Sequence, residues 1–178
     1  MIGKNRILWI APTILFLIAI LTFEGCGKPE KVIVLETTKG KIVIEPYPDS
    51  APKTVTNFKT LIKRGFYDGL TFHRYDGGMG IIQGGDPKGD GTGGPGWTIP
   101  DEFNERKHVT GAVGMAHTNE PNSAGSQFYI CLKPQPGLDG KYTVFGKVIK
   151  GMEAAKKLRA GDKMIKVILQ DKTKADFR

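Results

Sequence analysis

Eight short apolar runs recur between residues 32 and 169, and most of them are bounded by glycine or by a polar turn. They are VIVLET (32–37), KIVIE (41–45), LTFHRY (70–75), GIIQG (80–84), GAVGMA (111–116), QFYICL (127–132), YTVFGKVI (142–149) and KMIKVIL (163–169). Runs of this length between turn residues are typical of β-strands. The segment TKG between the first two runs predicts a tight hairpin. Many short strands with few helices indicate a mainly β fold, either a closed antiparallel barrel or a sandwich.

Two segments have the apolar spacing of α-helices instead. PDSAPKTVTNFKTLIKRG (48–65) contains Pro52 in its first turn and Gly65 as a stop signal, and we expect Asp49 or Ser50 to be the N-cap. Its apolar positions fall at helical intervals: Val55, Phe58, Leu61 and Ile62. A second, shorter helix is expected near MEAAKKLRA (152–160).

The N-terminus has a different character from the rest of the chain. Lys4 and Arg6 precede an uncharged apolar run from Ile7 to Phe23. Such a segment predicts export or membrane anchoring, and its length lies between those of a signal-peptide core and a spanning helix. Cys26 follows the run and resembles the acylated cysteine of bacterial lipoproteins, although Glu24 departs from that motif. A cleaved lipoprotein, an uncleaved anchor and a coincidental cysteine remain as alternatives.

These features predict three segments. Residues 1–25 form a signal peptide or membrane anchor, residues 26–31 a linker with Cys26 as the lipidation site, and residues 32–178 one globular domain. We expect that domain to lie in the cell envelope, tethered to a membrane and outside the cytoplasm. Cys131 would then be a single buried, inert thiol.

The charge and the polar motifs exclude several functions. The formal net charge is +8, but the lysines are scattered, so we expect a solvated surface and no nucleic-acid partner. The segment GGDPKGDG (84–91) lacks the lysine of a phosphate loop and has Lys88 at a position where a calcium loop needs a ligand. The histidines are far apart in sequence, so no zinc site is indicated. We predict no metal, no cofactor and a monomeric protein.

Three blocks remain, and they follow one another at intervals typical of one domain. They are FHRYDGGMGIIQGGD (72–86), MAHTNEPNSAGSQFYI (115–130) and GLDGKYTVFGKVIKGM (137–152). Together they resemble the cyclophilin family of peptidyl-prolyl cis/trans isomerases, and the resemblance extends from Val32 to Leu169. It implies a closed eight-stranded antiparallel β-barrel capped by two α-helices, with the substrate groove on its outer face.

The chemistry of this reaction explains an arginine and a glutamine beside an apolar surface. The peptide bond resists rotation because the nitrogen lone pair is delocalised, and the barrier is about 18–20 kcal/mol. A hydrogen bond to the prolyl nitrogen favours the localised lone pair of the twisted transition state, so it lowers the barrier. Arg74 is the candidate donor, since a guanidinium stays protonated. Gln83 is expected either to hold that guanidinium or to bind a substrate carbonyl.

The remaining site residues follow from strand alternation and from the resemblance. Alternation in QFYI places Phe128 and Tyr129 on opposite faces, and the family pattern assigns Tyr129 to the pocket for the proline ring. The same matching implies that the groove is lined by Ile81, Ala116, Gln127, Leu138 and Tyr142. The partners would be proline-containing polypeptides, in addition to the membrane reached by the N-terminal segment.

Three departures from the family pattern predict differences in binding. The segment between Arg74 and Gln83 is one residue longer than usual, so Met79 or Gly80 replaces a pocket phenylalanine and the pocket would be shallower. Gly137 stands where cyclosporin-sensitive members have tryptophan, which predicts weak cyclosporin binding. An extra residue before Pro121 would change which peptide residues are accepted. The predicted function is isomerisation of X-Pro bonds during folding of exported proteins, and the alternative is a non-catalytic peptide-binding or scaffold lipoprotein.

Overall fold

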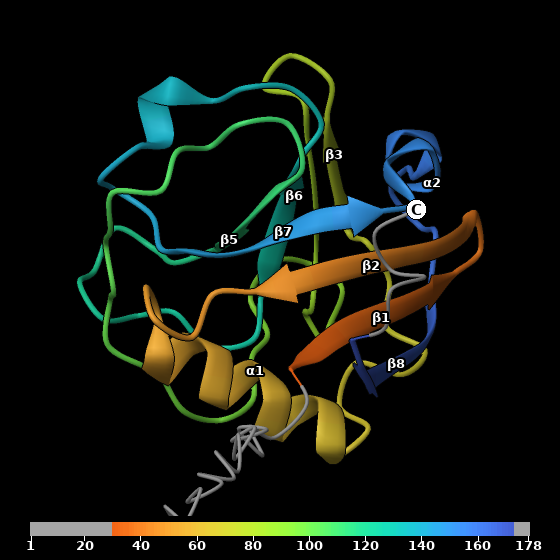
Figure 1. Ribbon diagram of the computed structural model, residues 1–178, viewed down its shortest axis with the longest axis horizontal. Helices are drawn as coiled ribbons and strands as arrows, with labels where there is room; N and C mark the ends of the chain where they lie inside the picture. The colour runs from red at the N-terminus through yellow and green to blue at the C-terminus, as the bar shows by residue number, and fades with distance from the viewer. Residues whose placement is uncertain (1–29, 173–178) are drawn as a thin grey trace, which may run out of the picture.

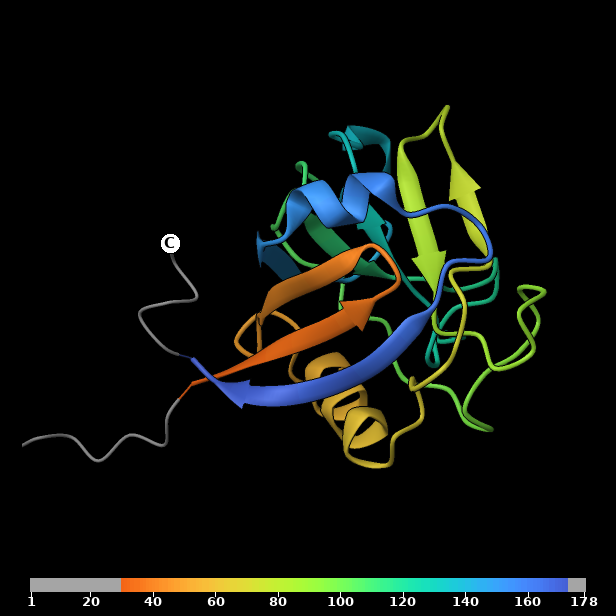
Figure 2. The same ribbon diagram turned by 90° about the vertical axis from the view of Figure 1, so that its right-hand side faces the viewer.

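All eight predicted strands form, and they belong to one antiparallel sheet. The computed structural model describes residues 30–172. Its strands are β1 (Lys31–Thr37), β2 (Gly40–Pro46), β3 (Arg74–Asp76), β4 (Ile81–Gly84), β5 (Ala112–Met115), β6 (Phe128–Cys131), β7 (Val144–Lys150) and β8 (Met164–Asp171). Their order in the sheet is β3-β4-β6-β5-β7-β2-β1-β8. The sheet curls into a half-barrel (Figure 1 and Figure 2).

The sheet is open between its end strands, which corrects the expectation of a closed barrel. Within residues 30–172, β3 and β8 form no ladder with each other. The predicted strand 70–75 is divided: only its end joins β3, while Phe72 donates its N–H to the carbonyl of Asp162 (2.8 Å) and accepts from Gly161 (2.9 Å). The two edges therefore meet through a few bonds between the segment that precedes β3 and the start of β8, and β3 itself is only three residues long.

The first and last described strands lie side by side in the sheet. In the β1–β2 hairpin Thr37 pairs with Gly40, as the TKG turn predicted. On its other edge β1 pairs with β8 from Lys31 opposite Asp171 to Thr37 opposite Met164. The two ends of the described chain are consequently neighbours, as Figure 2 also shows.

Helix α1 (Pro52–Lys63) begins without the expected N-cap. Ala51 occupies the N-cap position and no side chain of the helix start caps it, so neither Asp49 nor Ser50 has this role. The carboxylate of Glu102 substitutes for them by accepting the N–H groups of Lys53 (3.0 Å) and Thr54 (2.8 Å). A group distant in sequence thus satisfies the free N–H groups of the first turn.

An aromatic cluster joins α1 to the inner face of the half-barrel. The ring of Phe58 lies 4.6 Å from Tyr67, 5.2 Å from Phe128 and 5.0 Å from Phe145, measured between ring centroids. All four side chains are fully buried. Helix α2 (Met152–Lys157) packs on β2, and Figure 2 shows the two helices on opposite sides of the β1–β2 hairpin. A 3₁₀ turn, η1 (Pro136–Leu138), was not predicted.

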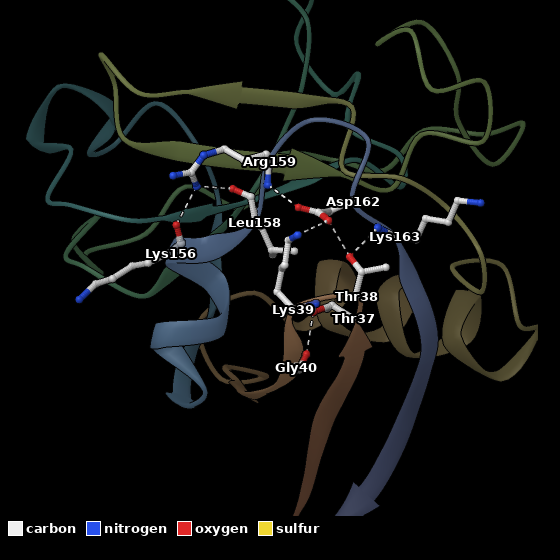
Figure 3. A network of polar contacts seen from close by, with 9 residues as sticks. All are labelled: Thr37, Thr38, Lys39, Gly40, Lys156, Leu158, Arg159, Asp162 and Lys163. Atoms are coloured by element: carbon white, nitrogen blue, oxygen red, sulfur yellow. Dashed lines mark hydrogen bonds and ion pairs between the residues drawn. The ribbon is translucent and has the colours of Figure 1, made fainter.

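A polar network connects the β1–β2 turn to the segment between α2 and β8 (Figure 3). The carboxylate of Asp162 accepts from the Thr38 hydroxyl and from the Arg159 N–H, both at 2.8 Å, and pairs with Lys39 at 3.3 Å. The guanidinium of Arg159 lies 4.4 Å above the ring centroid of Tyr75 in β3. The network therefore supports the short edge strand that begins with Arg74.

The predicted leader, linker and lipidation site fall mostly outside the described residues. This applies to the segment 1–25 and to Cys26. Within residues 30–172 no helix combines the length and apolar character needed to cross a membrane.

Candidate active site

One row of residues crosses four neighbouring strands and contains both predicted catalytic side chains. Arg74 in β3 pairs with Gln83 in β4, Gln83 with Tyr129 in β6, and Tyr129 with Gly114 in β5. Residues directly opposite one another in antiparallel strands share a face of the sheet. The pairing therefore places a guanidinium, an amide, a phenol and a bare glycine together on the outer face.

A second apolar cluster lies on the same face, separate from the main core. Phe128 belongs to the main core and Tyr129 to this outer cluster: they lie on opposite faces, as strand alternation predicted, and on the faces that the family pattern implied. The outer cluster contains six residues predicted for the groove, namely Met79, Ile81, Ala116, Tyr129, Leu138 and Tyr142. The structure therefore assembles the predicted apolar residues at one place, from four separate parts of the sequence.

Four further members of this outer cluster were missed by the sequence analysis: Tyr47, Ala112, Cys131 and Val144. Cys131 stands two residues after Tyr129, so strand alternation was the signal that places it on this face. It was expected to be a buried, inert thiol, and it is fully buried. Burial, followed by the negative charge of Asp139, raises the pKa of the Cys131 thiol to about 12, which keeps it protonated.

The two glutamines are linked to each other and to a neighbouring loop. Gln83 donates from Nε2 to Oε1 of Gln127 at 2.9 Å. Gln127 donates in turn to the carbonyls of Gly91 and Gly93, both at 2.9 Å. These bonds fix the orientation of the Gln127 amide. The second N–H and the Oε1 of Gln83 have no hydrogen-bond partner among residues 30–172.

Arg74 is held by its own hairpin and not by Gln83. Its Nη2 donates to Oδ2 of Asp76 at 2.9 Å and lies 3.8 Å from the sulfur of Met79. The N–H of Met79 and then the guanidinium of Arg74 lower the pKa of the Asp76 carboxyl, so that it stays ionised. The first alternative predicted for Gln83, that it holds the guanidinium, is corrected: Asp76 has this role because it stands two residues after Arg74, on the same face of β3. The side chain of Arg74 is 49% exposed, which leaves it accessible to a ligand.

The longer hairpin between Arg74 and Gln83 contributes Met79, and not Gly80, to the apolar cluster. Gly80 has a φ of +69°, and a Cβ there would lie 2.4 Å from Cγ of Lys133. The stem of Lys133 thus covers Gly80, whereas Met79 packs against the cluster. A side chain at position 80 has neither the backbone conformation nor the space that it would need.

A cavity of about 740 Å³ lies beside the two glutamines. It is lined by Gln83, Gln127, Ala116, His117 and the loop from 91 to 98. The buried carboxylate of Asp86 organises that loop by accepting the N–H groups of Lys88 (2.8 Å) and Gly91 (2.6 Å). Burial alone would raise the pKa of Asp86, but these hydrogen bonds outweigh it and lower the pKa. The Asp86 carboxylate in GGDPKGDG therefore has a structural role: it binds the backbone of its own loop.

His108 is a further residue that the sequence analysis did not place in the site. Its imidazole is buried and its Nε2 lies 2.9 Å from the Tyr129 hydroxyl. No local pattern indicates this contact, because 21 residues separate the partners. Within residues 30–172 no group of three or more His, Cys, Asp or Glu side chains is arranged to hold a metal ion.

Comparison with known proteins gives a single family. The model for "Cyclophilin type peptidyl-prolyl cis-trans isomerase/CLD" matches residues 32–176. Peptidyl-prolyl cis-trans isomerase B of Bacillus subtilis is 53% identical over 71% of this chain and 89% of its own length. A peptidyl-prolyl cis-trans isomerase of Synechococcus elongatus is 48% identical over 75% of this chain and 92% of its own length.

A solved structure agrees with these matches. The Cryptosporidium parvum cyclophilin, crystallised in the presence of the dipeptide Ala-Pro, superposes with a TM-score of 0.72 at 32% identity and covers 79% of this chain and 99% of its own. The match of both sequence and fold extends over almost all of the described residues. The chain belongs to the cyclophilin family of peptidyl-prolyl cis/trans isomerases.

Proposed function

We propose that Arg74 is the hydrogen-bond donor that lowers the barrier to X-Pro rotation on the outer face of the half-barrel. The observation that carries this proposal is the row Arg74–Gln83–Tyr129, which brings one guanidinium and one amide to the edge of the apolar cluster. Asp76 uses one Nη of Arg74, and the other N–H groups have no partner among residues 30–172. They are available to the prolyl nitrogen.

The rotation needs no covalent step, so catalysis rests on differential binding. A donor aimed at the prolyl nitrogen binds the twisted bond, whose lone pair is localised, more strongly than the planar ground state. The pairing with Asp76 orients the guanidinium before substrate arrives, which reduces the cost of ordering it. By analogy with other preorganised donors, this contact is worth roughly 3–4 kcal/mol.

The remaining residues would bind the peptide around that bond. The proline ring would occupy the pocket made by Met79, Ile81, Leu138 and Tyr142, with Tyr129 at its base. Gln83 would donate its second N–H to a substrate carbonyl, and Gln127 would keep Gln83 in place. The neighbouring cavity, with its polar glycine-rich lining, would accept a side chain beside the proline.

The decisive experiment is cis/trans exchange of an Ala-Pro peptide measured by NMR. The full-length chain, Arg74→Ala and Arg74→Lys are compared at equal concentration. We expect Arg74→Ala to lower the catalysed exchange rate by roughly a hundredfold or more. We expect Arg74→Lys to restore little, since a lysine has one nitrogen and cannot bond Asp76 with one planar N–H group while a second faces the prolyl nitrogen. Exchange that survives in Arg74→Ala would exclude this role.

The non-catalytic alternative has its own signature in the same experiment. A peptide-binding or scaffold protein would bind the peptide in a chemical-shift titration without accelerating its exchange, in the native chain as in both variants. The accessible arginine and its unused donors favour catalysis over this alternative.

We also propose an exported, membrane-tethered protein that acts as a monomer on exported polypeptides. The support is the uncharged run from Ile7 to Phe23 followed by Cys26. Expression in the presence of a radiolabelled fatty acid tests the tethering. If the protein is a lipoprotein, the native chain is labelled, and Cys26→Ser abolishes the labelling and shifts the mass of the protein. If labelling never occurs and the chain still fractionates with membranes, the anchor is uncleaved. A soluble, unlabelled chain would exclude tethering.

A further inference from the structure

A chain of hydrogen bonds runs from the base of the proline pocket into the protein. The Tyr129 hydroxyl lies 2.9 Å from Nε2 of His108, and Nδ1 of His108 lies 2.9 Å from Oδ1 of Asp139. The backbone N–H of His108 also donates to Oδ1 of Asp139 at 2.9 Å. The His108 side chain is 0% exposed, so water does not reach its ring nitrogens, whereas the Asp139 side chain is 20% exposed.

The direction of each hydrogen bond follows from the chemistry of the three groups. An ionised carboxylate only accepts hydrogen bonds, and the N–H bonds from His108 lower the pKa of Asp139 and keep it ionised. Nδ1 of His108 therefore bears a proton, and in the tautomer whose single ring proton is on Nδ1 the other nitrogen, Nε2, is an acceptor. In that tautomer the Tyr129 hydroxyl donates to Nε2, so the hydroxyl is directed to His108 and the ring faces the substrate.

Gly114 provides the space in which the ring lies. A Cβ added at Gly114 would stand 2.3 Å from Cζ and 2.4 Å from the hydroxyl oxygen of Tyr129. Gly114 is directly opposite Tyr129 in the β5–β6 ladder. The phenol therefore lies across bare backbone instead of standing up from the sheet, and the pocket above it stays open.

The segment that holds His108 also carries a wall of the pocket. Asp139 follows Leu138 directly, and the N–H of Gln135 donates to the His108 carbonyl at 2.7 Å. The Gln135 side-chain amide in turn donates to the carbonyl of Met79. The base of the pocket and two of its walls are thus fixed to one another by backbone and side-chain bonds.

We infer that His108, oriented by Asp139, is a positioning residue that fixes the Tyr129 ring as the floor of the proline pocket, and that Gly114 makes this placement possible. This inference rests on the proposed function of the outer face. It assigns to His108 control over peptide affinity, whereas Arg74 acts on the rate of rotation.

Two substitutions of His108 separate its two contacts. In His108→Gln the side-chain amide reaches the position of Nε2, so it can accept the hydrogen bond from Tyr129. In His108→Asn the amide reaches only the position of Nδ1, so it keeps the hydrogen bond to Asp139 and loses the one to Tyr129. We expect His108→Gln to keep the Ala-Pro peptide affinity and KM within about twofold of the native chain. We expect His108→Asn to weaken both by roughly three- to tenfold, the value of one neutral hydrogen bond.

The matched control is the same pair of substitutions in a Tyr129→Phe background, which has no hydroxyl to hold. There, His108→Asn should have no further effect on peptide affinity. Two results would overturn the inference by showing that His108 acts only on stability. One is that His108→Gln and His108→Asn weaken peptide affinity equally. The other is that His108→Asn weakens affinity as much in the Tyr129→Phe background as in the native chain.

A measurement without turnover tests the direction of the bonds. The ¹⁵N shifts of the His108 ring in the full-length chain should show a proton on Nδ1 and none on Nε2, and the reverse tautomer would overturn the inference. Failure of the Arg74 mechanism gives a different result: exchange then persists in Arg74→Ala, while the His108 tautomer and the affinity ratios remain as expected.

Discussion

Most polar side chains of the site use part of their hydrogen-bonding capacity on the protein itself. The Tyr129 hydroxyl is directed to His108, and the Gln127 amide to Gln83 and two loop carbonyls. Among the site residues that the structure describes, Arg74, part of Gln83 and the Tyr142 hydroxyl keep free donors at the groove. A substrate therefore meets few polar groups, and these are already oriented, which lowers the cost of binding a flexible peptide.

Gly114 gives a prediction at this scale. Gly114→Ala should lower the free energy of unfolding by about 1–3 kcal/mol, because the new methyl group cannot coexist with the Tyr129 ring and forces it from its position. The value is obtained from urea unfolding followed by far-UV circular dichroism. Gly94→Ala is the control, since a Cβ there meets nothing within 4 Å. If Gly114→Ala lowered the free energy of unfolding no more than Gly94→Ala does, the Tyr129 ring could move at no cost in stability, which would contradict the prediction.

Sequence alone could place the residues whose neighbours are set by strand period, and the family pattern added Leu138 and Tyr142, which lie outside the strands. Arg74, Gln83 and Tyr129 could be predicted because motif and alternation agree. His108 could not be assigned to the site, because its partners Tyr129 and Asp139 are 21 and 31 residues away and its own segment lies outside helices and strands. The Asp76 partner of Arg74 was available in the sequence, two residues along the strand, and was overlooked.

At the level of elements, α1 depends on a group that is not in the helix. The Glu102 carboxylate accepts two N–H groups of its first turn and places a negative charge at the positive end of the helix. Local sequence signals pointed to Asp49 and Ser50, because such residues usually cap helices. In the folded chain a residue from a distant loop accepts the free N–H groups of the first turn instead.

The same contact gives a prediction for the stability of the fold. Glu102→Ala should lower the free energy of unfolding by about 1 kcal/mol, within the range measured for the loss of a helix cap. Urea unfolding of the full-length chain provides the value. Glu105→Ala removes a nearby exposed carboxylate that forms no hydrogen bond among the described residues, and it should leave the midpoint unchanged. Equal shifts in both variants would assign the effect to net charge.

Strand positions were predictable, whereas closure of the sheet was not. Each strand shows itself locally through apolar runs and turns. Whether β3 and β8 form a ladder depends on how far each edge extends, and residues 70–72 pair with 161–164 before β3 begins. No local sequence pattern indicates which of these pairings forms, so the sequence analysis predicted a closed barrel where the structure has a half-barrel.

At the scale of the whole molecule, stability should fall with acid in two stages. Burial lowers the pKa of His73 below its ordinary value of about 6.5. Several aspartates also have lowered pKa values, and hydrogen bonds and ion pairs outweigh the effect of burial where it opposes them: Asp68, Asp76, Asp86, Asp90, Asp139 and Asp162. In each case the unfolded chain binds protons more readily than the folded chain.

The free energy of unfolding should therefore decrease as the pH falls. A small decrease is expected below about pH 6.5, where unfolded His73 becomes protonated, and a steeper one below about pH 4, where unfolded aspartates do. Urea midpoints between pH 3 and 8 measure both stages. His73→Asn should remove the first stage alone. Urea midpoints that rise as the pH falls would contradict the lowered pKa values of His73 and the aspartates.

The neighbouring ends of β1 and β8 have a mechanical consequence. Lys31 is opposite Asp171, and the interstrand hydrogen bonds run perpendicular to both strands. A force applied between residues 30 and 172 acts along those bonds and breaks them one after another. It begins at the backbone hydrogen bond and ion pair between Glu30 and Lys172, and the Lys31–Asp171 ion pair follows. Pulled by its two ends, this domain unzips at a low force, however high its free energy of unfolding.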